Sequence, residues 1–94
     1  MEKLTIKEKV ADVFEVPSEV ATDVPKIVML GRKKLVLENY KGIKGYDPDK
    51  VRLNTGIGVV TITGIGLCIS EVTTEDILVE GIINSVQFDV INGN

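Results

Sequence analysis

The sequence lacks histidine altogether and contains a single cysteine, Cys68. Without a second thiol the chain cannot close an internal disulfide, and without histidine it cannot build a Cys/His zinc site or an imidazole proton shuttle. We therefore expect no enzymatic activity, no metal and no cofactor. Cys68 stands between Leu67 and Ile69 with no activating neighbour, so we expect it to pack as a small apolar residue.

Long apolar runs and an excess of positive charge are also missing. Nowhere do about 18 apolar residues follow one another, as a membrane span requires, and the first residues lack the apolar segment of a signal peptide. With 14 acidic against 11 basic residues the net charge is −3, which gives no general attraction to a phosphate backbone. We expect a cytoplasmic protein that binds no nucleic acid and reaches a membrane only through a partner.

The 94 residues suffice for one folded domain, and the mixture of 44% hydrophobic and 27% charged residues is that of a globular chain. Near the start, Ile6, Val10, Val13 and Phe14 recur at helical spacing, and Pro17 follows them. This pattern predicts an amphipathic helix within residues 1–16, followed by a single β domain in residues 17–94.

From Lys26 onward, short aliphatic and β-branched runs are interrupted by Gly, Asn, Asp or Pro about every eight to ten positions. This texture predicts a mainly β fold, an antiparallel meander of about seven or eight short strands that forms a curled sheet, a small barrel-like sheet or a sandwich. The predicted strands are residues 26–30, 34–39, 43–46, 50–55, 58–63, 66–70, 77–81 and 83–90.

Apolar residues alternate with mostly polar ones inside these strands, which predicts one buried face. The alternating apolar pairs are Leu35/Leu37, Val51/Leu53, Val60/Ile62, Leu67/Ile69 and Ile77/Val79. An open sheet of this kind also has edge strands with unpaired backbone groups, and these edges are natural binding sites for another protein or for a second copy of the chain.

A Thr-Gly-Ile-Gly sequence occurs twice, at residues 55–58 and 63–66. Each copy lacks the third glycine, the following helix and the lysine of a phosphate-binding loop, so we interpret both as hairpin turns. Asp47-Pro48-Asp49 offers two carboxylates, but a calcium loop needs further oxygen ligands. It is better explained as a turn.

A dispersed set of residues resembles the YabP/YqfC family of sporulation proteins, and the YqfC branch is the most similar. The set comprises Asp23-Val24-Pro25, Gly31, Leu35, Glu38-Asn39, Gly42-Ile43, Tyr46, the segment 51–55 (Val-Arg-Leu-Asn-Thr), Gly58, Ile62, Gly64, Leu67, Ile69, Ile77, Gly81, Ile83, Ser85-Val86 and Phe88. Tyr40 departs from the family, in which a histidine is frequent there. The resemblance implies a role in endospore formation beside a membrane-bound sporulation partner, and it implies no catalytic residue.

Glu38, Asn39, Tyr46 and Arg52 are the predicted interaction residues, because they are polar or amphipathic and lie in the segment most similar to the family. Local backbone needs also explain Asn39, whose amide can satisfy neighbouring backbone groups. Arg52 alternates with apolar neighbours and should point away from the core.

Two other functions remain open. The chain could be a small-ligand or metal-binding domain or an enzyme that uses its acidic residues and Tyr46. It could also bind a membrane surface through Lys3, Lys7 and Lys9, although neighbouring acidic residues dilute that charge. A protein-interaction function is favoured over both.

Overall fold

The structure is a computed structural model that describes residues 24–89, which form one antiparallel sheet of six strands. The strands are β1 (Lys26–Leu30), β2 (Lys34–Glu38), β3 (Tyr40–Asp47), β4 (Lys50–Thr55), β5 (Gly58–Val72) and β6 (Asp76–Phe88). Their order across the sheet is β1-β2-β6-β5-β4-β3. The mainly β prediction is confirmed, whereas the helix expected within residues 1–16 lies outside the described part of the chain.

The prediction of seven or eight short strands is wrong for residues 24–89. The predicted strands 58–63 and 66–70 are parts of one 15-residue strand, β5, and the strands predicted to start at residues 77 and 83 belong to one 13-residue strand, β6. Gly64, Gly66 and Gly81 lie inside these strands. They bend the chain without reversing it.

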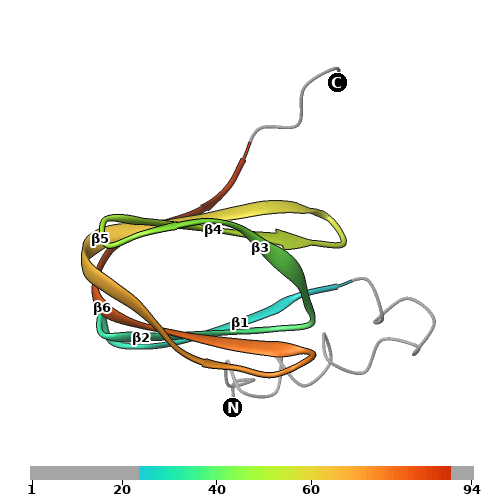
Figure 1. Cartoon of the computed structure of the whole chain (residues 1–94), viewed down its shortest axis with the longest axis horizontal. Helices are drawn as coiled ribbons and strands as arrows, with labels where there is room; N and C mark the ends of the chain where they lie inside the picture. Colours follow the sequence, from blue (N-terminus) through green and yellow to red (C-terminus); the bar gives the residue numbers. More distant parts are fainter. Residues whose placement is uncertain (1–23, 90–94) are drawn as a thin grey trace, which may run out of the picture.

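The bends of β5 and β6 fold the sheet into two layers (Figure 1). The first part of β5 pairs with β4 and with the last part of β6; we call these segments and β3 the β3 layer. The last part of β5 pairs with the first part of β6, which also pairs with β2; these segments and β1 form the β1 layer. The sheet is curled but does not close into a barrel, because β1 and β3 end it as separate outer strands.

The core lies between the two layers and follows the predicted alternation. Buried pairs face each other across neighbouring strands, Leu37 beside Ile77 in the β1 layer and Leu53 beside Val60 in the β3 layer. The buried apolar residues are Leu35, Leu37, Val51, Leu53, Val60, Ile62, Leu67, Ile77, Val79 and Ile83. Burial of these side chains is the main favourable term in folding.

The bends bring the backbones of β5 and β6 very close together. A Cβ atom on Gly64 would lie 2.0 Å from the carbonyl oxygen of Ile82, and one on Gly81 would lie 2.7 Å from that of Gly66. Gly81 also has a φ of 139°, which other residues rarely adopt. The interpretation of residues 63–66 as a hairpin turn is therefore wrong, because this glycine-rich segment is a bend held against another strand.

Two hairpin turns brace the bends. In the turn between β1 and β2, the carbonyl oxygens of Lys33 and Arg32 accept hydrogen bonds from the amides of Gly81 and Ile83, at 3.1 and 2.8 Å. In the turn between β3 and β4, the Pro48 carbonyl accepts from the Leu67 amide at 2.7 Å, and the Asp49 carbonyl accepts from the Gly64 amide at 3.1 Å. The Asp47-Pro48-Asp49 turn is confirmed, and its backbone supports the bend of β5.

Candidate interaction surface

The four predicted interaction residues do not form one surface. Glu38 and Asn39 occupy the corner between β2 and β3, whereas Arg52 pairs with Gly45 near the opposite end of β3. Tyr46 pairs with the buried Val51, so it lies on the inner side of the sheet, and Arg52 lies on the outer side. Each residue has a structural explanation of its own.

Glu38 and Asn39 order the corner that carries the chain from one layer to the other. The Glu38 carboxylate pairs with Lys26 at 3.9 Å. Asn39 has a φ of 68°, its backbone amide donates to the Glu75 carbonyl at 2.6 Å, and its side-chain amide donates to the Val24 carbonyl at 3.2 Å. Asparagine tolerates this left-handed conformation better than most residues, so the local backbone accounts for its presence.

Tyr46 lies on the edge strand β3 and is 48% exposed. Its hydroxyl donates a hydrogen bond to the Leu67 carbonyl at 3.2 Å, at the bend of β5. This bond ties β3 to the bend beside the contacts made by Pro48 and Asp49. The Tyr46 hydroxyl therefore already makes a contact within the fold.

Arg52 points away from the core, as predicted, because its neighbours Val51 and Leu53 are fully buried. Its guanidinium pairs with the Asp89 carboxylate at 2.5 Å, and the Thr61 hydroxyl donates to the other Asp89 oxygen at 2.6 Å. The Thr61 hydrogen bond and then the Arg52 guanidinium lower the pKa of Asp89 below its usual value. Asp89 was not among the predicted interaction residues, because it follows the family-like segment and meets Arg52 only through strand pairing.

The outer face of the β1 layer has an ordered pattern of rows that run across the strands. Val28, Val36 and Leu78 are register partners on β1, β2 and β6 and form an apolar row. Ion pairs flank this row on both sides, Lys26 with Glu38 at 3.9 Å and Lys34 with Glu80 at 3.4 Å. The apolar row ends at the outer edge of β1.

Among residues 24–89, no strand pairs with the outer edge of β1. The three residues at its end are exposed apolar side chains: Val28 is 41%, Met29 41% and Leu30 66% exposed. Residues 27–30 carry no charge, and the pairing of β1 with β2 runs without a bulge. The uncharged run Ile-Val-Met-Leu was the sequence signal for this edge, and the prediction of interaction residues overlooked it.

The edge strand at the other end of the sheet, β3, has the features that usually prevent strand addition. Lys41, Lys44 and Asp47 place charges along it. Its pairing with β4 shifts register twice, between Tyr40 and Gly42 and again between Ile43 and Gly45. Charges and bulges on edge strands discourage pairing with other chains. Among the described residues, β1 is thus the outer strand that lacks bulges and, at positions 27–30, charges.

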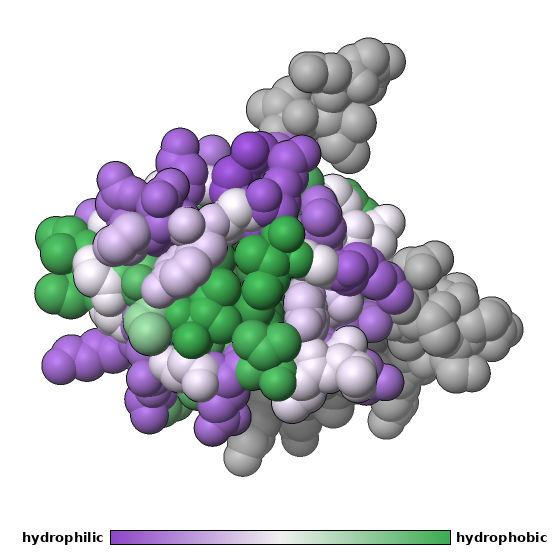
Figure 2. Space-filling model, in the orientation of Figure 1, coloured by the Kyte–Doolittle hydropathy of each residue, from purple (hydrophilic) through white to green (hydrophobic). Residues whose placement is uncertain are grey.

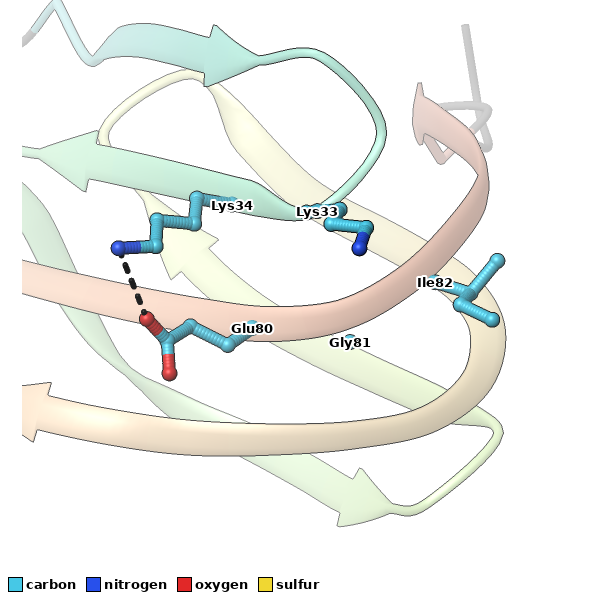
Figure 3. A pocket seen from close by; sticks show the side chains of 5 residues that line it. All are labelled: Lys33, Lys34, Glu80, Gly81 and Ile82. Atoms are coloured by element: carbon cyan, nitrogen blue, oxygen red, sulfur yellow. Dashed lines mark ion pairs between the residues drawn. The ribbon is translucent and has the colours of Figure 1, made fainter.

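The hollow beside the β1–β2 turn is shallow, and one pair of opposite charges borders it. Its volume is about 350 Å³, and its lining includes Lys34, Glu80 and Ile82. Figure 3 shows the Lys34 ammonium pointing toward Glu80, with Ile82 further along β6. The Ser70 hydroxyl also donates to Glu80, and this hydrogen bond is the largest cause of the lowered pKa of that carboxyl. These charges already have partners within the protein.

Two further expectations concern Cys68 and metals. Cys68 is an exposed free cysteine and pairs in register with Glu80, so the expectation that it packs as an apolar residue is wrong. Because side chains alternate along a strand, Cys68 lies on the other face of the sheet from the buried Leu67. In the part of the chain that the structure describes, no group of three or more His, Cys, Asp or Glu side chains could hold a metal ion.

Apolar side chains also gather elsewhere on the surface. Figure 2 shows one apolar cluster between the two layers, with hydrophilic side chains above and below it, and another at the end where β5 and β6 bend. Exposed apolar residues at the bend include Ile65 and Ile82. Within residues 24–89 there is no helix long and apolar enough to cross a membrane.

Comparison with known proteins agrees with the family resemblance. The model of the YabP family matches residues 22–92. The chain is 35% identical over 75 residues to the uncharacterized protein YqfC of Bacillus subtilis (strain 168), an alignment that covers 80% of this chain and 81% of that protein. All six strands lie within the range that the family model matches. The chain therefore belongs to the YabP family, a family of sporulation proteins.

Proposed function

We propose that this chain is a non-enzymatic protein that acts in endospore formation by binding other proteins through the outer edge of β1. The observation that supports this proposal is the combination of a bulge-free edge, uncharged along residues 27–30, with the exposed side chains of Val28, Met29 and Leu30. A strand from another protein can pair with the backbone of such an edge, while the side chains give specificity.

The partner is proposed to be a membrane-bound sporulation protein or a second copy of the chain. Family membership supports the sporulation setting. Docking on such a partner would hold a cytoplasmic protein at the membrane surface without a membrane-spanning segment of its own. The rows of the β1 layer provide recognition, because an apolar centre between salt-bridged borders resembles the apolar core and polar rim of protein interfaces.

No observation favours the ligand-binding or enzymatic alternative. Its main candidate is Tyr46, whose hydroxyl donates a hydrogen bond to the backbone carbonyl of Leu67. The carboxylates with lowered pKa values, Glu80 and Asp89, accept hydrogen bonds from hydroxyl groups and pair with Lys34 and Arg52. Salt-bridged structural carboxylates explain these pKa shifts without a reaction.

Capture from sporulating cells tests the proposal. The tagged wild-type protein should recover a membrane-bound sporulation protein, and Val28→Lys should lose it because a charge then lies in the centre of the docking edge. Ile43→Lys is the matched control, since Ile43 is also β-branched, lies on the other outer strand and is 46% exposed. It should recover the partner as the wild type does.

Both variants must first show the melting temperature of the wild type, which separates lost binding from lost folding. The proposal is wrong if Val28→Lys melts normally and still recovers the same partner in the same amount. It is also wrong if Ile43→Lys loses the partner as completely as Val28→Lys does, because the effect would then not be specific to β1.

A further inference from the structure

The proposed function leaves open which protein pairs with β1, and the residues of this strand and its neighbours identify one. We propose that β1 pairs antiparallel with β1 of a second copy. The two-fold axis of this dimer lies where Val28 of one copy pairs with Val28 of the other. This inference rests on the proposed function, because it names the partner for the same edge. It follows from symmetry, from the rows of the β1 layer and from the charges beside them.

Symmetry limits the registers that two β1 strands can adopt. An antiparallel edge-to-edge dimer has its two-fold axis perpendicular to the sheet, so each face of one copy continues the same face of the other. Directly paired residues must then lie on the same face, and side chains alternate between faces along a strand. At the axis a residue therefore pairs with the same residue of the second copy. The axis never falls between two successive residues of a strand. An axis through Val28, the central residue of Lys26–Leu30, is the one that pairs all five positions.

This register continues the rows of both faces. On the outer face, Val28 meets Val28 of the second copy, which joins the two apolar rows Leu78, Val36 and Val28 into one row across the dimer. On the inner face, Ile27 meets Met29 of the second copy. Ile27 packs against the core, and Met29 pairs with the buried Leu35. At the three central positions, residues 27–29, apolar side chains thus meet apolar side chains on both faces.

The charged rows are compatible with the same register. Lys26 meets Leu30 of the second copy, and Lys34 of that copy stands one strand further away, about 10 Å from Lys26 by strand spacing. Both lysines are paired with carboxylates of their own chain, at 3.9 and 3.4 Å. Charges separated by more than about 8 Å are largely screened at physiological salt. No like charges are therefore placed against each other.

A five-residue strand pair is a small interface, so the dimer should exchange with monomer and depend on protein concentration. Sedimentation velocity should show wild-type protein and Ile43→Lys shifting from monomer to dimer as concentration rises. Val28→Lys should remain monomeric over the same range, because two lysines would face each other at the axis.

Disulfide trapping tests the register directly. Val28→Cys and Leu30→Cys are each made in the Cys68→Ser background, which removes the exposed native thiol. At the axis the two residues 28 lie about 5 Å apart between Cα atoms, which suits a disulfide, whereas the two residues 30 lie about 14 Å apart along the strands. Mild oxidation should therefore cross-link Val28→Cys far faster than Leu30→Cys.

Equal cross-linking of the two cysteine variants would overturn the register, since random collision would explain it. A wild-type protein that remains monomeric up to its solubility limit, with no disulfide in Val28→Cys, would overturn the dimer. If capture of a membrane-bound partner still depended on Val28, the proposed function would stand. If the dimer formed and Val28→Lys still captured that partner normally, the dimer would stand and docking of that partner at β1 would fail.

Discussion

Arg52 and Asp89 show how much of a single residue's role is visible in the sequence. Alternation with Val51 and Leu53 correctly placed Arg52 on the outer face. Its ion pair with Asp89 spans 37 positions in the chain and exists because β4 pairs with β5 and β5 with β6. Local patterns carry no information on such a contact. The pair anchors the end of β6, which gives Arg52 a structural role in addition to its predicted role as an interaction residue.

Acid should weaken this anchor. The pKa of Asp89 is lowered in the folded protein below the ordinary value of an Asp carboxyl, first by Thr61 and then by Arg52. The carboxylate therefore contributes stability above the unfolded pKa, and this contribution is lost as pH falls through the folded pKa. Asp89→Asn should melt at a lower temperature than wild type at neutral pH and should lose less of its stability on acidification.

Melting curves at neutral and strongly acidic pH measure this difference. Asp47→Asn is the control, because no hydrogen bond or ion pair of the Asp47 side chain occurs among the described residues. It should retain the pH dependence of the wild type. Part of that dependence will persist in Asp89→Asn because the pKa of Glu80 is also lowered. Identical melting of Asp89→Asn and wild type at every pH would show that the anchor contributes nothing.

Among the elements, the two Thr-Gly-Ile-Gly segments explain why the strand count could not be predicted. At residues 55–58 the Thr55 hydroxyl donates to the Gly58 carbonyl at 2.7 Å and accepts from the Ile57 amide at 3.1 Å, which closes a hairpin turn. At residues 63–66 the same sequence is a bend, and the amide of Gly64 donates to the β3–β4 turn. Tertiary contacts decide between the two outcomes, and a local motif cannot.

The bend leaves no space for a side chain at Gly64. A Cβ atom there would lie 2.0 Å from the Ile82 carbonyl oxygen, so Gly64→Ala must push apart two central strands. We expect the free energy of unfolding to fall by about 3 kcal/mol, the upper part of the usual range for overpacking. Urea denaturation measures it.

Gly45→Ala is the matched control, because a Cβ atom on Gly45 would have no neighbour within 4 Å. Its unfolding free energy should remain within about 0.5 kcal/mol of wild type. A Gly64→Ala protein as stable as Gly45→Ala would mean that β5 and β6 are further apart at the bend than the structure places them.

For the whole molecule, the alternation of apolar residues identified most of the core, without Ile83, but not its arrangement. Leu35, Leu53 and Val79 were recognisable as inward-facing from their own strands. The two layers arise because β5 and β6 are long enough to belong to both, a property of long-range pairing that short windows of sequence do not contain. The division into residues 1–16 and 17–94 remains a prediction.

The open edge of β1 is the feature of the whole molecule on which the proposed function depends. The four residues chosen from the sequence serve the corner, the bend and the anchor, whereas Val28, Met29 and Leu30 are exposed at the edge of the sheet. The four residues predicted from the sequence are polar or aromatic, because residues at protein interfaces frequently are. An apolar edge strand has the composition of an ordinary core strand, and its exposure becomes visible only in the fold.

Spore yield from cells whose chromosomal copy carries Val28→Lys tests this function most directly, with Ile43→Lys as the control and with the melting temperature and cellular amount of both proteins checked against wild type. We expect Val28→Lys to lower the yield of heat-resistant spores at least tenfold and Ile43→Lys to leave it unchanged, because a charge at the centre of β1 blocks strand pairing. Normal spore yield from a folded, normally abundant Val28→Lys protein would contradict the claim that the protein acts through this edge.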